Sequence, residues 1–359
     1  MVINARSVLF LFCMLLLGCN SRTPLTNQSP EYKIVSATNS VYGSVHVWDS
    51  LLIYCTWQPA TVAIKNIITD SPVFSFALQE ECYAAPILRG NKLVVQRARG
   101  LISCIDIDSK NVQWDYQTEG RNRTLHLAAD SIIIASVNGK GLVAINLKTG
   151  QLMYKLEPDK NCTLPVGFLY NVTSDDKHLY VAEWERSPLA TFDLLTGKLL
   201  WQVRTEALYT CTKPVIIDKY IFVGLDGLTG PDCTDANIGG YLLINRSDGV
   251  IVLYRESDPV SYLTPPHDSS TVYFTTWKDT VGHLLSLNIN TLKTDTLHAY
   301  SSYDRIDDDL YLADDNLYFT KRHTHLNRFN IKNHKISPLN SELHSGNAVK
   351  YKDITYIIE

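Results

Sequence analysis

Short segments in which apolar and polar residues alternate recur along the whole chain. Each segment runs into an Asn or Asp, a polar turn that often contains Thr-Gly or Asp-Gly, and a second alternating stretch. The clearest copies read GLISCIDIDSKNVQW, GLVAINLKTGQLMY, LATFDLLTGKLLW and YLLINRSDGVIVLY. Weaker copies read TVAIKNIITDSPVFSF, LLSLNINTLKTDTL and LNRFNIKNHKISPL. The Asn or Asp anchors are Asn66, Asp106, Asn146, Asp193, Asn245, Asn288 and Asn330, at intervals of 40 to 52 residues.

Each repeat predicts four β-strands. Two strands flank the anchor turn, and two more lie upstream, as in residues 85–97 and 214–225. A four-stranded unit that returns every 40 to 50 residues is typical of a β-propeller blade. The anchor side chain is suited to bond its own backbone, and Gly supplies a positive φ. We therefore predict an all-β fold in which the repeat's closing aromatic packs between blades, at Trp114, Tyr154, Trp201 and Tyr254.

The number of blades follows from the chain ends. Eight segments read as the second strand of a blade, but there are seven anchors, because the chain ends after two strands of an eighth unit. Residues 32–38 could supply the missing outer strand and close the ring, which removes its free edges. We expect one propeller domain over 31–359 with eight blades; seven blades is the alternative.

The stretch TFDLLTGKLLW (191–201) resembles the repeat of PQQ-like propellers, and the resemblance extends over roughly residues 44–343. That family includes quinoprotein dehydrogenases and the propeller lipoprotein of the outer-membrane β-barrel assembly machine. The enzymes hold PQQ and Ca²⁺ and use a catalytic Asp. This chain has no adjacent cysteine pair and no segment that matches their catalytic one. Since function resides in sites rather than folds, we expect no catalytic residues, no cofactor and no enzymatic activity.

The N-terminus predicts an exported lipoprotein. Residues 1–18 have one cation and a short apolar core, which is typical of a signal peptide. Leu16, Leu17 and Gly18 before Cys19 resemble the bacterial lipobox, so Cys19 is the expected lipidation site; an ordinary signal peptide is the alternative. Residues 19–30 are polar and predict a flexible tether. Because position 20 is Asn and not Asp, we expect an outer-membrane anchor that faces the periplasm.

Charge limits the partners. Loss of residues 1–18 removes Arg6 and no acid, which takes the formal net charge from −4 to −5. The chain has no basic block, so nucleic acid is excluded as a partner. We expect a monomeric propeller that binds a protein, a peptide or a saccharide.

The longest insertion, residues 224–240, carries Asp226, Asp232 and Asp235. Their spacing fits no EF-hand, so a solvated acidic loop is favoured over a Ca²⁺ site, and we expect no metal. Blade topology places Cys211 near this loop and predicts a disulfide with Cys233. The pairing of Cys55, Cys82, Cys104 and Cys162 stays open.

One set of positions suggests a binding surface. Nine residues before three of the anchors stand Trp57, Arg97 and Trp184, and Trp277 and Arg322 occupy similar places in later copies. Equivalent positions in successive blades converge at one mouth of a propeller, and Trp and Arg are typical of recognition surfaces. The alternative is that these side chains only pack loops. The favoured hypothesis is a membrane-anchored binding or scaffold protein, with a role in outer-membrane protein assembly implied by the resemblance. The alternatives are a saccharide- or small-ligand-binding propeller, and a PQQ- or metal-dependent oxidoreductase.

Overall fold

A computed structural model gives the fold of the chain. It describes residues 32–35, 46–56, 59–82, 84–120, 122–137, 140–158, 171–184, 187–203, 212–226, 239–263, 270–278, 280–301, 306, 310–313, 315–320, 326–338, 347–351 and 354–358. Within these residues the regular structure is almost entirely β, as expected. The exception is one 3₁₀ turn, Ala98–Gly100. No helix in these ranges is long and apolar enough to span a bilayer.

The described strands form seven four-stranded antiparallel sheets, numbered here in chain order. Sheet one contains β2 (His46–Trp48), β3 (Leu51–Thr56), β4 (Thr61–Asn66) and β5 (Ser71–Ala77). Sheet two contains β6 (Ile87–Arg89), β7 (Lys92–Gln96), β8 (Leu101–Asp106) and β9 (Asn111–Gln117). Sheet three contains β10 (Asn122–Ala128), β11 (Ile132–Val137), β12 (Gly141–Asn146) and β13 (Leu152–Leu156). Sheet four contains β14 (Val172–Ser174), β15 (His178–Trp184), β16 (Ser187–Asp193) and β17 (Leu199–Gln202).

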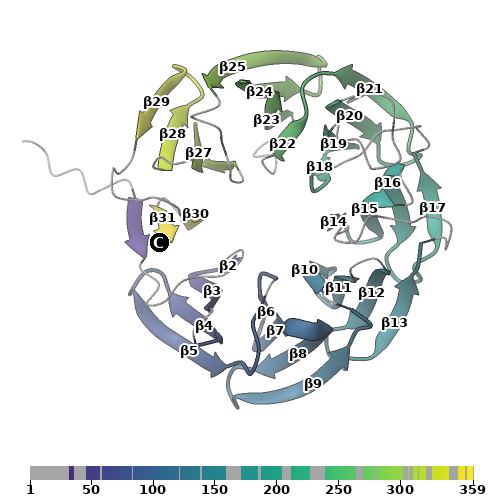
Figure 1. Ribbon diagram of the computed structural model, residues 1–359, viewed down its shortest axis with the longest axis vertical. Helices are drawn as coiled ribbons and strands as arrows, with labels where there is room; N and C mark the ends of the chain where they lie inside the picture. The colour runs from purple at the N-terminus through teal and green to yellow at the C-terminus, as the bar shows by residue number, and fades with distance from the viewer. Residues whose placement is uncertain are drawn as a thin grey trace, which may run out of the picture.

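The remaining sheets follow the same plan. Sheet five contains β18 (Val215–Ile217), β19 (Tyr220–Asp226), β20 (Gly239–Asn245) and β21 (Ile251–Glu256). Sheet six contains β22 (Val260–Leu263), β23 (Thr271–Lys278), β24 (Val281–Asn288) and β25 (Lys293–Ser301). Sheet seven contains β26 (Tyr311–Ala313), β27 (Asn316–Thr320), β28 (Leu326–Asn330) and β29 (Lys335–Pro338). In Figure 1 the sheets stand around a common centre, with the first strand of each innermost and the fourth at the periphery.

A further sheet joins the two ends of the described chain. It has three strands in the order β1 (Tyr32–Val35), β31 (Ile354–Ile358) and β30 (Asn347–Tyr351). β1 runs parallel to β31, with Tyr32 opposite Thr355. In Figure 1 β1 is the purple strand beside β31. Counted from β30, β31 is the second strand of this sheet and β1 is the third. In a fully antiparallel four-stranded sheet the strand that runs parallel to the second strand is the fourth. β1 therefore has the direction expected of a fourth strand, although it lies in the third position. This polarity suits its position in the chain, because β2, the innermost strand of sheet one, comes next.

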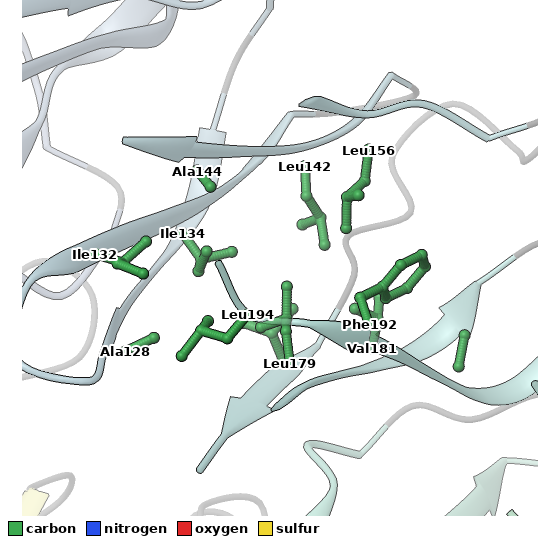
Figure 2. Packing of buried hydrophobic residues seen from close by; sticks show 12 residues of the cluster. Ala128, Ile132, Ile134, Leu142, Ala144, Leu156, Leu179, Val181, Phe192 and Leu194 are labelled. Atoms are coloured by element: carbon green, nitrogen blue, oxygen red, sulfur yellow. The ribbon is translucent and has the colours of Figure 1, made fainter. Parts of the chain in front are cut away.

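The core lies between neighbouring sheets. Successive side chains on a strand point to opposite faces, and this alternation lets one strand serve two interfaces. On β7, Leu93 and Val95 pack toward sheet one, whereas Val94 packs toward sheet three. Figure 2 shows the interface of sheets three and four, where Ile134 and Leu142 face Leu179 and Phe192. A buried cluster of this kind joins each consecutive pair of sheets from one to seven.

The anchor residues cap their turns as predicted. Asn146 Oδ1 accepts the backbone N–H of Lys148 at 2.9 Å and of Thr149 at 3.0 Å. The other six anchors accept equivalent backbone N–H groups. Gly150 follows with a φ of 72°. The turn chemistry read from the repeats is therefore confirmed.

The closing aromatics lock adjacent sheets together. Trp114 of sheet two lies against Gly150 of sheet three, Tyr154 lies against Gly197, and Trp201 lies against Gly249. The prediction for Tyr254 is wrong: its side chain is 43% exposed, and Leu253 packs at the interface instead. Leu253 stands eight residues after its anchor, as the three locked aromatics do, and Tyr254 stands nine. A shift of one residue moves a strand side chain to the other face.

Candidate functional site

The second strand of each sheet ends at the same edge of the fold, which we call the strand-end face. Arg97 directly follows β7, and Trp184 ends β15, where it pairs with Ser187. Val137 ends β11 at the equivalent place, nine residues before Asn146. Val137 is neither aromatic nor charged, so nothing in the sequence marks it as a site residue. The predicted series thus runs through consecutive sheets, with an apolar member in sheet three.

Polar side chains are buried one residue earlier in the same series. Thr56, Gln96 and Ser136 are 4%, 0% and 1% exposed. Thr56 Oγ1 donates to the carbonyl oxygen of Pro59 at 2.8 Å, and Gln96 Nε2 donates to that of Arg97 at 2.6 Å. Among the described residues, four side-chain polar atoms are buried without a hydrogen-bond partner: Gln96 Oε1, Arg97 Nε, Ser136 Oγ and Thr191 Oγ1. Buried polar atoms normally have partners, and three of these four belong to residues at the ends of β7 and β11.

The turn after β7 presents positive charge. The Arg97 N–H donates to the carbonyl oxygen of Leu101 at 2.7 Å, and the Ala98 N–H donates to that of Glu81 at 2.8 Å. These bonds fix a tight turn in which Arg99 adopts a φ of 61°. The Arg99 side chain is 86% exposed and lies 3.6 Å from Glu80 Oε1. A rigid turn therefore holds the Arg99 guanidinium in solvent.

A small cleft lies between sheets two and three on the strand-end face. Its volume is about 80 Å³. Its floor combines Tyr116 with Val137, Leu142 and Val143, and its rim is charged. The other lining residues are Gln117, Thr118, Glu119, Lys140, Lys155 and Glu157. Pockets for drug-sized ligands measure about 300–1,000 Å³, so this cleft is suited to a single side chain of a partner.

Glu119 organises the charges at the rim. Its carboxylate lies 2.8 Å from Lys155 Nζ and 3.2 Å from Lys140 Nζ. Hydrogen bonds from Lys155 and Lys140 hold the pKa of Glu119 below its usual value. The bond to Glu119 also raises the pKa of Lys155. The rim therefore places the Nζ atoms of Lys140 and Lys155 around one carboxylate.

The basic turn and the cleft are parts of one surface. Gln117 Nε2 donates to the carbonyl oxygen of Arg99 at 2.8 Å, and Thr118 Oγ1 donates to that of Gly100 at 2.8 Å. Gln117 and Thr118 also line the cleft. We call the turn and the cleft together the 2/3 surface. It combines buried apolar residues with exposed charged ones.

Trp277 lies away from this surface. Its ring stacks on Tyr300 of β25, with centroids 6.3 Å apart and planes at 14°. It packs at the interface of sheets six and seven. For Trp277 the structure thus shows the packing that was the alternative to binding, and its binding role stays a prediction.

Several predicted site residues lie outside the described part of the chain. They are Cys19, Trp57, Cys162, Cys211, Asp232, Cys233, Asp235 and Arg322. Asp226 ends β19 with its side chain outside the description, and the same holds for the Trp184 side chain. The Cys211–Cys233 disulfide and the acidic loop therefore stay predictions. Cys55, Cys82 and Cys104 are described, and each is a buried free thiol.

A polar pair bridges the innermost strands of sheets three and four. His126 Nε2 lies 2.8 Å from Ser174 Oγ. Burial, with a smaller contribution from the charge of Lys213, lowers the pKa of His126 to about 3. A Ser–His pair can act in nucleophilic catalysis, but an imidazole of such low pKa is a weak general base at neutral pH. We interpret this pair as a structural bridge between two sheets.

The described residues contain no cluster of metal ligands. Within these ranges, no three His, Cys, Asp or Glu side chains gather into a group that could hold a metal ion. The 2/3 cleft is also far smaller than a small-molecule pocket.

The repeated four-stranded sheets, capped turns and aromatic locks are those of a β-propeller fold. Residues 33–163 match the family model described as outer membrane protein assembly factor BamB. The resemblance read from the repeats is thus confirmed, and the chain is a PQQ-like propeller similar to BamB. Curated protein sequences give no match.

Three solved structures share the fold. BamB from Moraxella catarrhalis is 18% identical with a TM-score of 0.57, over 79% of this chain and 83% of that one. The computationally designed protein Ika8 is 15% identical with a TM-score of 0.59, over 79% and 80%. Quinohemoprotein alcohol dehydrogenase from Comamonas testosteroni is 11% identical with a TM-score of 0.61, over 89% and 70%. At these identities the likeness shows the fold alone.

Proposed function

We propose that this chain is a membrane-anchored scaffold protein that faces the periplasm and binds a protein partner through the 2/3 surface. The observation that carries the proposal is the cleft between sheets two and three. It combines an apolar floor with charged rim residues, and it adjoins the exposed Arg99. The centre of a protein interface is apolar and its rim is polar.

The same proposal includes a role in outer-membrane protein assembly. It is supported by the family match over residues 33–163, which contain all of sheets one, two and three. The lining residues of the cleft, from Tyr116 to Glu157, fall inside this matched stretch. We also propose anchoring through lipidated Cys19 and a ring of eight blades closed by β1 and β31. Supporting the closed ring, β1 pairs with β31 in the sheet that follows the seven others.

A binding titration tests the function. The purified full chain is titrated with components of the barrel assembly machine and with unfolded barrel precursors. We expect saturable binding that Lys140→Glu weakens several-fold, because the substitution reverses a charge on the rim. Lys148→Glu is the matched control, since Lys148 lies in the anchor turn at the opposite edge of sheet three. Absence of binding by every component and precursor would overturn the assembly role.

We further propose that the ring has no catalytic activity. The likeness to the alcohol dehydrogenase is one of fold at 11% identity, and function does not follow fold. Incubation with PQQ and Ca²⁺, followed by gel filtration and an absorbance scan, tests this proposal. Co-elution of PQQ, together with dye reduction by an alcohol, would contradict it.

A further inference from the structure

Two thiols meet in the interface between sheets one and two. Cys55 lies on β3 and is 0% exposed; Cys82 lies in the segment between β5 and β6 and is 2% exposed. Both belong to the cluster that joins these two sheets, together with Ile53 and Leu93. Cys104 is buried just as fully, but it faces the interface between sheets two and three.

The two thiols are joined by a hydrogen bond. The Cys55 side chain bonds to the Cys82 side chain, and Cys82 Sγ in turn donates to the carbonyl oxygen of Ala84 at 3.2 Å. The shared bond raises the pKa of Cys55, and burial acts in the same direction. It lowers the pKa of Cys82 despite burial, and a backbone hydrogen bond with Gln96 acts in the same direction. The pair is therefore asymmetric, with Cys82 the better thiolate.

We propose that Cys55 and Cys82 form a redox-sensitive disulfide that links the second strand of sheet one to the segment leading into sheet two. Three observations carry the proposal: the two side chains belong to one hydrophobic cluster, both are almost fully buried, and they come from chain segments on either side of one interface. Their mutual hydrogen bond supports it. The inference is independent of the proposed binding function.

The bond forms by thiol–disulfide exchange with a small-molecule or protein disulfide as oxidant. The Cys82 thiolate attacks one sulfur of the oxidant, and the other sulfur leaves as a thiolate. Cys55 then attacks the Cys82 sulfur of the mixed disulfide and releases the second oxidant thiolate. The protons of both cysteines pass to the two leaving thiolates. Cys55 and Cys82 lose two electrons, and the oxidant is reduced to two thiols.

Burial determines when this exchange takes place. Neither sulfur is accessible in the closed interface, so the oxidant reaches Cys82 when sheets one and two separate locally or before they have packed. Once formed, the disulfide encloses β4 and β5 in a covalent loop. Such a loop restricts the unfolded chain and stabilises the folded one. Oxidation should therefore raise the melting temperature.

Peptide mapping tests the bond directly. The full chain is incubated with oxidised glutathione in mild denaturant, refolded, alkylated and digested with trypsin without reduction. Cleavage after Lys33, Lys65, Arg89, Arg99 and Lys110 puts Cys55, Cys82 and Cys104 in three separate peptides. We expect peptide 34–65 joined to peptide 66–89, with the total mass reduced by two hydrogen atoms. Peptide 100–110 should carry an alkylated Cys104. Alkylation of both Cys55 and Cys82, or pairing of either with another cysteine, overturns the proposal.

Variants connect the bond to stability. In the wild-type protein the melting temperature should be a few degrees higher after oxidation than after reduction with dithiothreitol. This difference should vanish in Cys55→Ala and in Cys82→Ala, and it should persist in the matched control Cys104→Ala. An unchanged difference in Cys55→Ala would overturn the proposal. If the two alanine variants do not fold, the peptide map of the wild-type protein decides alone.

Discussion

Trp114 on the outer strand of sheet two donates its indole N–H to the carbonyl oxygen of Leu147 in sheet three, at 3.0 Å. Tyr154 makes the same contact one sheet further on, where its hydroxyl donates to the carbonyl oxygen of Leu194 at 2.7 Å. In both cases the acceptor directly follows an anchor residue. The repeat thus encodes a joint between sheets, in which the aromatic of one copy bonds to the turn of the next.

The first prediction concerns the hydrogen bond of this joint. Tyr154→Phe keeps the ring and removes the hydroxyl, so the carbonyl of the fully buried Leu194 loses its donor. We expect the free energy of unfolding to fall by about 1 kcal/mol, the usual contribution of such a bond. Denaturant titration measures the change. Tyr254→Phe is the matched control, because Tyr254 is 43% exposed. Equal losses in both variants would contradict the stabilising role of the Tyr154–Leu194 hydrogen bond.

The second prediction concerns the glycine of the joint. Gly197 has a φ of 70°, and a Cβ there would come within 2.5 Å of the Tyr154 ring. Gly197→Ala adds a steric conflict to the backbone strain, and we expect a loss of roughly 2–4 kcal/mol in the free energy of unfolding. Gly90→Ala separates the two causes, since Gly90 has a φ of 60° and no atom within 4 Å of the added Cβ. A loss at Gly197 no larger than at Gly90 would show that the ring moves aside.

The third prediction concerns acid stability of an anchor turn. Hydrogen bonds from the Thr196 hydroxyl and backbone N–H hold the pKa of Asp193 below its usual value. A carboxyl with a lower pKa in the folded state stabilises the fold above its unfolded pKa of about 3.9, and this contribution is lost as pH falls through the folded pKa. Asn fills the same position in other copies, so Asp193→Asn should keep the turn. We expect this variant to lose less stability than the wild type between about pH 5 and pH 2, as measured by thermal melts.

The fourth prediction concerns His126, whose pKa is about 3 in the fold. Because an unfolded histidine binds protons near pH 6.5, acid favours the unfolded chain. The fold is therefore fully stable with respect to this group above about pH 6.5 and loses stability as pH falls toward 3. His126→Gln should flatten the melting temperature over this range. The exposed His334, changed to Gln, serves as control, and parallel pH profiles for His126→Gln and wild type would refute the assignment.

The fold was largely predictable because its signals are local. The alternation of apolar and polar residues, the Asx turns and the turn glycines all lie within single repeats. The seven anchors and their turns could therefore be predicted from the sequence. The error at Tyr254 has a physical cause. The bulge between Leu243 and Ile244 stands at the same offset from the anchor as in sheets two to four, so the interface position is the same. In sheet five that position is filled by the aliphatic Leu253, and the aromatic comes one residue later.

The site was less predictable because it depends on contacts between repeats. Arg97 stood out as a charged residue at a strand end, whereas Val137 gave no signal. The Glu119 carboxylate meets Lys140 and Lys155 only because sheets two and three pack side by side. Likewise, no pattern in the sequence indicates that Cys55 and Cys82 lie close together. Their proximity depends on the path of the segment between β5 and β6, which carries Cys82.

The pairing of β1 with β31 has a consequence for the order of folding. Every other described strand finds its partners within its own repeat, so each sheet can form soon after its residues emerge. β1 has to wait for residues 354–358, the last part of the described chain. Contacts between such distant residues form slowly, and until then the unpaired edges of β1 and β31 are open to other strands. The final joining of the two termini should therefore be the slow step of refolding and the stage most prone to aggregation.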